Sequence, residues 1–304
     1  MNLSVQLGRL KLKNPVTVAS GTYGYGEEFS ELVDLNQLGG IAVKGLTLKP
    51  RKGNPPQRIV ETPSGMLNSI GLQNVGVDTF IEKKIPFLKK FDTQVIANIN
   101  GVSDEEYEEL AKRLEPIQEV AALEINLSCP NVKEGGIHFG SKPDKIYEVT
   151  SRVRKAFSRG VLTKLSPNVT DIVPMAEAVE AAGADGISMV NTLVGMAIDV
   201  ERRQPVLKSI TGGLSGPAIK PIALRMVYEV HSKLDIPILG MGGIATVEDA
   251  LEFLMAGATA ISIGTANFYN PLTPLKILDG LKKYMEKFNF KKISEITGSL
   301  KVNQ

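Results

Sequence analysis

Residues 236–266, IPILGMGGIATVEDALEFLMAGATAISIGTA, contain two short apolar runs separated by one amphipathic segment. The runs IPILGMGG and AISIGTA are apolar at nearly every position, which is typical of strands buried on both faces of a parallel sheet. The segment between them has an expected helix N-cap at Thr246 and ends near Gly257. The stretch is therefore expected to form one strand–helix–strand unit with parallel strands.

The same alternation of short apolar runs and longer amphipathic segments extends along the chain. The runs EAAGADGISMVNT (180–192) and LMAGATAISIGTA (254–266) even share a helix end, a glycine turn and an apolar strand. Strands are expected at 14–20, 40–45, 94–101, 122–128, 161–167, 186–192, 236–243 and 260–266. Helices are expected near 28–35, over 77–91, after Ser103, over 143–158, 171–184, 217–234 and 246–257, and after Pro271. Eight such units predict an α/β fold, a single (β/α)₈ TIM barrel over residues 1–304.

Four segments exceed the usual length of a connection: 1–14, 46–76, 130–142 and 193–216. The last three follow strands 2, 4 and 6, so they are expected at the carboxyl-terminal face of the barrel, where the chemistry of this fold takes place. The first is expected to form a β-hairpin under the barrel. No linker or second domain is expected.

Composition excludes several functional classes. The chain has 35 basic and 33 acidic residues and no basic block, which gives no electrostatic reason to expect nucleic acid or a membrane surface as a partner. No apolar run of about 18 residues and no signal-peptide core occur, so a cytoplasmic protein is expected. One cysteine and two histidines exclude an intrachain disulfide and a four-cysteine iron–sulfur cluster, and no metal site is expected.

Glycines end the last two expected strands, in GMGGI (240–244) and IGTA (263–266). Glycine lets the backbone approach a ligand closely, and loops after strands 7 and 8 bind phosphate in many TIM barrels. The helix capped by Thr246 would add a positive dipole end. These glycines alternatively serve only tight turns. If they bind phosphate, the ligand is a sugar phosphate or flavin mononucleotide (FMN).

Two lysines and a set of amides are expected at the same face. Lys44 ends strand 2 and Lys164 lies late in strand 5, where a cation could stabilise a reduced flavin. Either lysine could instead extend to solvent. The amides are Asn68, Asn98, Asn126, Asn131 and Asn191, in loops or at strand ends. One such asparagine commonly forms a turn, but several together suit a pyrimidine imide edge or a flavin ring.

Cys129 is the only cysteine, in EINLSCPNV (124–132) at the end of strand 4. A thiolate there could act as nucleophile or general base. No histidine partner is evident, since His138 lies in the same insertion and His231 on an outer helix. The spacing alone leaves catalytic and structural roles equally open.

Several stretches together resemble the dihydroorotate dehydrogenases, in family order and over nearly the whole chain. They are NPVTVASGTYGYGEE (14–28), AVKGLTLKPRKGNPPQRIVETPSGMLNSIGLQN (42–74), EINLSCPN (124–131), VNT (190–192), GLSGPAIKP (213–221) and GMGGI (240–244). Cys129 stands where the membrane-associated class usually has serine, and the style of ASGTYGYG (19–26) separates the chain from the fumarate-using soluble class. Within the family it is most similar to catalytic subunits of the NAD-linked class 1B.

The resemblance implies a role for each matching residue. FMN would be held by Ser20, Lys44, Gly45, Asn98, Asn126, Lys164, Val190, Gly216, Gly242, Gly243, Gly264 and Thr265. Dihydroorotate would be held by Lys44, Asn68, Ser69, Ile70, Gly71, Leu72, Asn126, Asn191 and Thr192. Cys129 would remove a proton from C5 as hydride leaves C6 for flavin N5, and its loop would close over the substrate. The implied reaction is the oxidation of (S)-dihydroorotate to orotate in pyrimidine (UMP) biosynthesis.

An NAD-linked enzyme of this class would need a partner. The chain lacks a Rossmann G-x-G-x-x-G and the cysteines for its own cluster, so FAD and a [2Fe–2S] cluster would belong to an electron-transfer subunit. The implied assembly is a heterotetramer of two catalytic and two electron-transfer chains. The alternatives are a class 1A-like homodimer that uses fumarate, a phosphosugar isomerase barrel without flavin, and a non-catalytic phosphate-binding protein.

Overall fold

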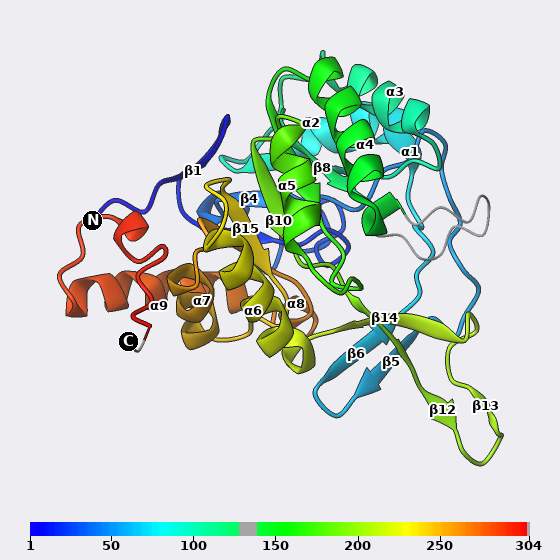
Figure 1. Ribbon diagram of the computed structural model, residues 1–304. Coiled ribbons are helices and arrows are strands. Elements are labelled where there is room, and N and C mark those ends of the chain that lie inside the picture. Colours follow the sequence, from blue (N-terminus) through cyan, green and yellow to red (C-terminus); the bar gives the residue numbers. More distant parts are fainter. Residues whose placement is uncertain (128–138, 303–304) are drawn as a thin grey trace.

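The computed structural model describes residues 1–127 and 139–302 and contains a closed barrel of parallel strands (Figure 1). The barrel strands, in chain order, are β3 (Val16–Val18), β4 (Gly40–Ala42), β7 (Gln94–Ile99), β8 (Val120–Asn126), β9 (Gly160–Lys164), β10 (Gly186–Met189), β15 (Ile238–Met241) and β16 (Ala260–Ile263). Each strand pairs with its neighbours in this list, and β16 closes the barrel on β3. Every residue of β9, β10, β15 and β16 is buried, as expected for strands covered on both faces. The predicted TIM barrel is confirmed.

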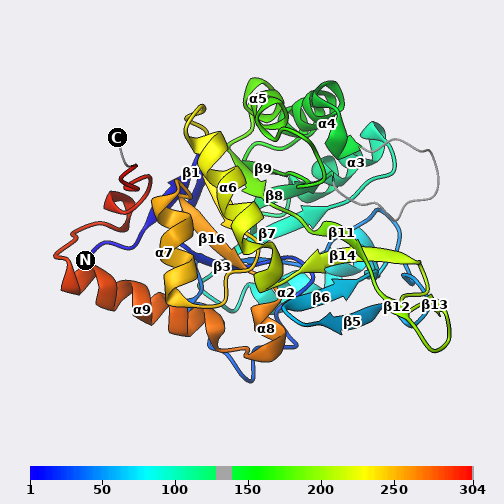
Figure 2. The same ribbon diagram turned by 60° about the horizontal axis from the view of Figure 1, so that its bottom comes forward.

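Helices surround this barrel (Figure 2). They are α1 (Gly76–Thr79), the π-helical turn η2 (Phe80–Lys84), α2 (Ile85–Leu88), α3 (Asp104–Leu114), α4 (Pro143–Ala156), α5 (Val173–Ala181), η4 (Pro217–Ile219), α6 (Lys220–His231), α7 (Val247–Met255), α8 (Ala266–Tyr269), α9 (Thr273–Lys287) and η5 (Ile293–Glu295). Thr246 caps α7 in a complete capping box with Asp249. Across the described ranges, no helix combines the length and apolar character needed to cross a bilayer.

One predicted helix is absent. The segment near 28–35 consists of turns, followed by the 3₁₀ helix η1 (Leu35–Gln37). The ring of Phe29 stacks on Tyr23 at 4.1 Å, and the Glu28 carboxylate accepts a hydrogen bond from the backbone N–H of Tyr25. These contacts fix a turn conformation, whereas so short a helix would gain little from its own hydrogen bonds.

The N-terminal segment forms the predicted hairpin, β1 (Val5–Leu7) and β2 (Leu10–Leu12). Leu7, Leu10 and Leu12 are almost completely buried. They lie beside Gly186, Gly160 and Gly40, the first residues of β10, β9 and β4, where an added Cβ would meet them within 3.1–3.7 Å. The hairpin therefore closes the amino-terminal end of the barrel and leaves the opposite end for ligands.

The insertions after β4 and β10 fold together. They form an antiparallel sheet in the order β11-β14-β6-β5, made of β5 (Ile59–Thr62), β6 (Gly65–Asn68), β11 (Leu193–Met196) and β14 (Thr211–Ser215). A small hairpin, β12 (Ile198–Asp199) with β13 (Gln204–Pro205), extends from it (Figures 1 and 2). The pairing of β6 with β14, in register at Asn68 and Gly213, joins the two insertions. The sequence indicated two separate loops here. The insertion after β8 is described only from Phe139, where η3 (Phe139–Ser141) begins.

Candidate active site

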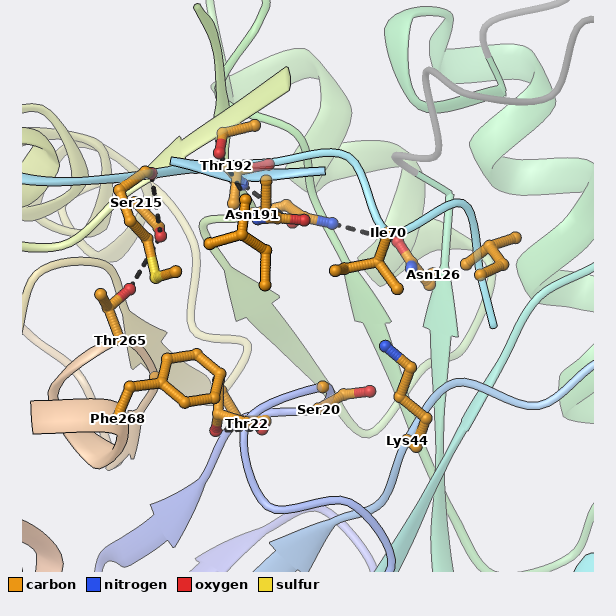
Figure 3. Close-up of a pocket in the computed structure, with 18 of the residues that line it drawn as sticks. Ser20, Thr22, Lys44, Ile70, Asn126, Asn191, Thr192, Ser215, Thr265 and Phe268 are labelled. Atoms are coloured by element: carbon orange, nitrogen blue, oxygen red, sulfur yellow. Dashed lines mark hydrogen bonds between the residues drawn. The ribbon is translucent and has the colours of Figure 1, made fainter. Parts of the chain in front are cut away.

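A cavity of about 780 Å³ lies between the carboxyl-terminal end of the barrel and the insertion sheet. Its volume is within the usual range for small-molecule sites, roughly 300–1,000 Å³. The predicted site residues that line it are Ser20, Lys44, Asn68, Ile70, Gly71, Leu72, Asn126, Lys164, Val190, Asn191, Thr192, Gly216, Gly242, Gly243, Gly264 and Thr265. The fold thus brings most of the predicted site into one cavity. Figure 3 shows Lys44 and Ser20 across the cavity from Asn191 and Thr192.

Three predicted residues lie behind the wall. Gly45 leaves space for amides, since an added Cβ would lie 2.5 Å from Asn100 Nδ2 and 2.8 Å from Asn98 Oδ1. Asn98 is buried, and its side chain contacts other polar residues of the barrel. Ser69 is buried, and its backbone N–H donates to the carbonyl of Arg58. Cys129 and Asn131 are outside the described residues.

One end of the cavity is built from glycines. Gly216, Gly242 and Gly243 have positive φ angles of 94°, 128° and 81°. Glycine is required at Gly243, because an added Cβ would lie 2.8 Å from the carbonyl oxygen of Gly216. Thr265 donates from its hydroxyl to Ser215 Oγ at 2.8 Å. The backbone is therefore exposed to the cavity, next to a threonine hydroxyl, as an anion site requires.

Two observations show that this end suits a phosphate-bearing ligand. An added Cβ at Gly264 would meet only Ala19 Cβ, at 3.7 Å, so packing within the protein does not require glycine there. The hydroxyl of Ser262, which also lines the cavity, is buried without a hydrogen-bond partner among residues 1–127 and 139–302. Space and an unsatisfied polar group face the same volume. The residues present fit the phosphate and sugar chain of a nucleotide cofactor.

The other end of the cavity carries lysines and amides. Lys164 is 6% exposed, and its Nζ lies 3.6 Å from Oε2 of the fully buried Glu124. Asn98 Nδ2 donates to the same carboxylate oxygen at 2.6 Å. Lys44 also lines the cavity, and its Nζ would lie 3.5 Å from a Cβ added at Gly21. A buried lysine thus has a buried counter-ion, as the cost of burying charge requires.

Asparagine side chains connect this ion pair to the cavity. Asn100 Nδ2 donates to Asn98 Oδ1 at 2.9 Å, and Asn126 Nδ2 donates to Asn100 Oδ1 at 2.8 Å. Asn191 Nδ2 then donates to Asn126 Oδ1 at 3.1 Å, an interaction drawn in Figure 3. Finally, the backbone N–H of Thr192 donates to Asn191 Oδ1 at 2.8 Å.

Glu124 and Asn100 were not identified from the sequence as site residues. A signal was present, because polar residues alternate in NIN (98–100) and EIN (124–126). In a strand, residues two apart face the same side, and here that side is the barrel interior. Asn98 is in register with Glu124, and Asn126 with Lys164.

Basic residues of the first insertion were also missed. Arg51, Lys52 and Arg58 line the cavity. The guanidinium of Arg58 donates to Gln73 Oε1 at 2.6 Å. With Lys44 they give this side a positive potential, which suits an anionic ligand. The arrangement can bind a flat polar ring between amides and lysines, with a phosphate at the glycine end.

Comparison with known proteins gives a consistent result. A family model described as dihydroorotate dehydrogenase matches residues 2–285. The chain is 57% identical over 298 residues to a protein of Trichlorobacter lovleyi, with 98% of each chain covered. It is 56% identical over 303 residues to one of Thermoanaerobacter sp., covering 100% of both chains. It is 55% identical over 302 residues to one of Caldicellulosiruptor bescii, covering 99% of this chain and 100% of the relative. All three relatives carry the name dihydroorotate dehydrogenase B (NAD(+)), catalytic subunit.

Proposed function

Because the chain belongs to the dihydroorotate dehydrogenase family, we propose that it oxidises (S)-dihydroorotate to orotate in pyrimidine biosynthesis. The observation that supports this most directly is one cavity whose lining includes Gly216, Gly243 and Gly264 together with Lys44, Asn126 and Asn191. A ligand with a phosphate and a flat ring would span its length, and a small anionic ring would fit beside it.

FMN is the proposed cofactor. The glycine end, with Gly216, Gly243, Gly264 and Thr265, would hold its phosphate, and Lys164 and Asn126 would contact its ring. The remaining proposed FMN ligands are Ser20, Lys44, Gly45, Asn98, Val190 and Gly242. When bound, FMN would supply the acceptor for the hydride that leaves C6 of the substrate. Lys164 would hold positive charge at the ring and so favour its reduced form.

The substrate would bind against the insertion sheet. Lys44 would pair with an anionic group, and Asn68, Asn126 and Asn191 would meet the donors and acceptors of the pyrimidine ring. The proposed site also includes Ser69 to Leu72 and Thr192. Cys129, outside the described residues, would take the proton from C5. Closure of its loop would exclude water from the reacting atoms.

The final electron acceptor is proposed to be NAD⁺, in accordance with the names of the relatives. One cysteine cannot ligate a four-thiolate cluster, so this chain would need a partner that carries one. The proposed partner is an electron-transfer subunit with FAD and a [2Fe–2S] cluster, in a heterotetramer of two chains of each kind.

A visible spectrum of the purified chain tests the proposal. The protein should be yellow with bound FMN, and anaerobic dihydroorotate should bleach it while orotate forms in equal amount. A colourless protein with phosphosugar isomerase activity would contradict both cofactor and reaction. A yellow protein that dihydroorotate does not bleach would retain the flavin and overturn the substrate.

A further inference from the structure

A row of polar side chains runs inside the barrel from β9 through β8 to the end of β7, returns to β8 and ends in the loop after β10. It begins with the Lys164–Glu124 ion pair and continues through Asn98, Asn100 and Asn126 to Asn191. The successive hydrogen bonds measure 2.6, 2.9, 2.8 and 3.1 Å. Each side-chain amide donates to the next residue toward Glu124, so the row has one direction.

Both ends of the row impose that direction. An ionised carboxylate can only accept hydrogen bonds, so Asn98 must turn its NH₂ group toward Glu124 and its oxygen toward Asn100. At the other end, the backbone N–H of Thr192 can only donate, so Asn191 must present its oxygen there. Asn126 lies between these constraints. Its NH₂ group faces Asn100 and its oxygen faces Asn191, and this determines which groups of its amide remain for a ligand.

The buried carboxylate is poorly explained by stability alone. Glu124 is 0% exposed, and its Oε1 has no hydrogen-bond partner within the described part of the chain. Replacing buried ion pairs with apolar residues is often neutral or stabilising, so such a pair is weak support for a structural role. Lys164, which pairs with Glu124, and Asn126, which is connected to it through Asn100 and Asn98, both line the cavity.

We propose that Glu124 is a positioning residue with two roles. It holds Lys164 in the cavity wall, and it fixes the direction of the amide row. One buried charge thus sets both the electrostatics and the hydrogen-bonding pattern of the site. The proposal rests on the proposed function, because Lys164 and Asn126 act on a ligand only if FMN and dihydroorotate occupy the cavity. Glu124 would contact neither of them directly.

Glu124→Gln removes the charge and keeps an oxygen that can accept from Asn98. With less compensation for Lys164, the site should favour the negatively charged reduced flavin. We expect the ratio of the dissociation constants of oxidised and reduced FMN to rise at least about tenfold, which is ~30 mV in the two-electron midpoint potential. The affinity for orotate should stay within about twofold, because the side-chain oxygen of the glutamine can still accept from Asn98 and so keeps the direction of the row.

Glu119→Gln is the matched control. Glu119 precedes the first residue of β8, at the opposite end of the strand that carries Glu124, and pairs with Lys89 at 2.8 Å. This control should leave the midpoint potential unchanged. A Glu124→Gln protein with an unchanged or more negative potential would overturn the electrostatic part of the proposal.

Asn100→Ser tests the amide row separately and serves also if Glu124→Gln does not fold. It interrupts the row but leaves the Lys164–Glu124 pair in place. The loss of oriented hydrogen bonds should weaken orotate binding by about tenfold, with the potential unchanged. Wild-type affinity for orotate in this variant would refute the orienting role. Wild-type protein that binds no FMN would refute the proposed function instead.

Discussion

At the residue scale, a substitution at Gly264 distinguishes an effect on FMN affinity from an effect on the stability of the fold. Its Cβ position is open toward the cavity, and its φ angle is not among the positive ones. Gly264→Ala should leave the free energy of unfolding of the FMN-free protein within about 0.5 kcal/mol of wild type. The added methyl group should weaken FMN binding by about 1–3 kcal/mol, or roughly 5- to 150-fold. Urea denaturation and flavin fluorescence titration measure the two quantities.

Gly243→Ala is the contrasting variant. There the backbone has a φ of 81°, and the new Cβ would lie 2.8 Å from a backbone oxygen. The strain should lower the free energy of unfolding by about 1–3 kcal/mol even without FMN. If Gly264→Ala loses as much stability as Gly243→Ala, its glycine serves the fold and not a ligand.

Cys129 carries the proposed chemistry. Cys129→Ala should slow the reduction of bound FMN by dihydroorotate by about 10²–10⁴-fold, the usual contribution of a general base. Stopped-flow absorbance in the flavin band measures this rate. FMN content and orotate affinity should stay near wild type, because only the proton acceptor is removed. Reduction at the wild-type rate would assign the base to another residue.

The sequence identified residues that line the cavity better than it identified the residues behind them. Lys44, Lys164, Asn126 and Asn191 stand at strand ends, where position alone indicated the cavity. Glu124 and Asn100 gain their meaning from contacts across strands. Those contacts depend on the register of β7, β8 and β9, which a single sequence does not specify.

At the scale of elements, Asp249 fastens α7 to α6 behind the glycine end of the cavity. Burial alone would raise the pKa of Asp249, but the hydrogen bonds from Lys220 and from the backbone N–H groups of Ala245 and Thr246 lower it below its usual value. A carboxylate whose pKa is lowered in the folded state stabilises it above the unfolded pKa of about 3.9, and this stabilisation is lost as pH falls through the folded pKa.

Asp249→Asn should therefore cost about 1–2 kcal/mol of unfolding free energy at pH 7. The difference from wild type should shrink as the pH is lowered below about 4. Urea titrations at several pH values measure it. Asp279→Asn is the control, since Asp279 forms an exposed pair with Lys283 and its replacement should change the free energy of unfolding little. A pH-independent cost at Asp249 would mean that its charge does not contribute.

The insertion sheet supports the substrate side of the cavity. An added Cβ at Gly213, in β14, would lie 2.2 Å from Thr192 Oγ1. Gly213→Ala should displace Thr192 and weaken orotate binding by about tenfold, with little change in FMN affinity. In the control Gly195→Ala, the nearest atom would be the end of the Leu67 side chain, at 2.9 Å, which can move. Equal losses in both variants would exclude a specific effect on Thr192.

The barrel elements followed from the sequence because each strand and helix carries its own local pattern. The insertion sheet did not, since β6 and β14 pair across 145 residues of sequence at Asn68 and Gly213. Pairings of this kind depend on where the barrel places the two loops. The helix expected near 28–35 is absent for a related reason, because the contact of Tyr23 with Phe29 outweighs local helix propensity.

At the scale of the whole molecule, the proposed function divides the redox chemistry between two chains: this barrel would hold FMN, and a partner subunit would pass the electrons to NAD⁺. One cysteine excludes an intrinsic four-thiolate cluster, and the relatives that match the full length are named as catalytic subunits. The oxidation of dihydroorotate and the reduction of NAD⁺ can therefore be measured separately, by assaying the chain without and with a partner subunit. The isolated chain should be bleached by dihydroorotate, and it should reduce neither NAD⁺ nor fumarate at a significant rate.

Adding an electron-transfer subunit that carries FAD and a [2Fe–2S] cluster should restore NADH formation, followed at 340 nm under anaerobic conditions. The same subunit with its cluster removed is the control, because it retains the protein contacts and lacks the electron path. Turnover with fumarate by the isolated chain would instead identify a self-sufficient homodimer. Dihydroorotate should bleach the flavin whether the final electron acceptor is NAD⁺ or fumarate. The experiment therefore identifies the final acceptor independently of the oxidation of dihydroorotate.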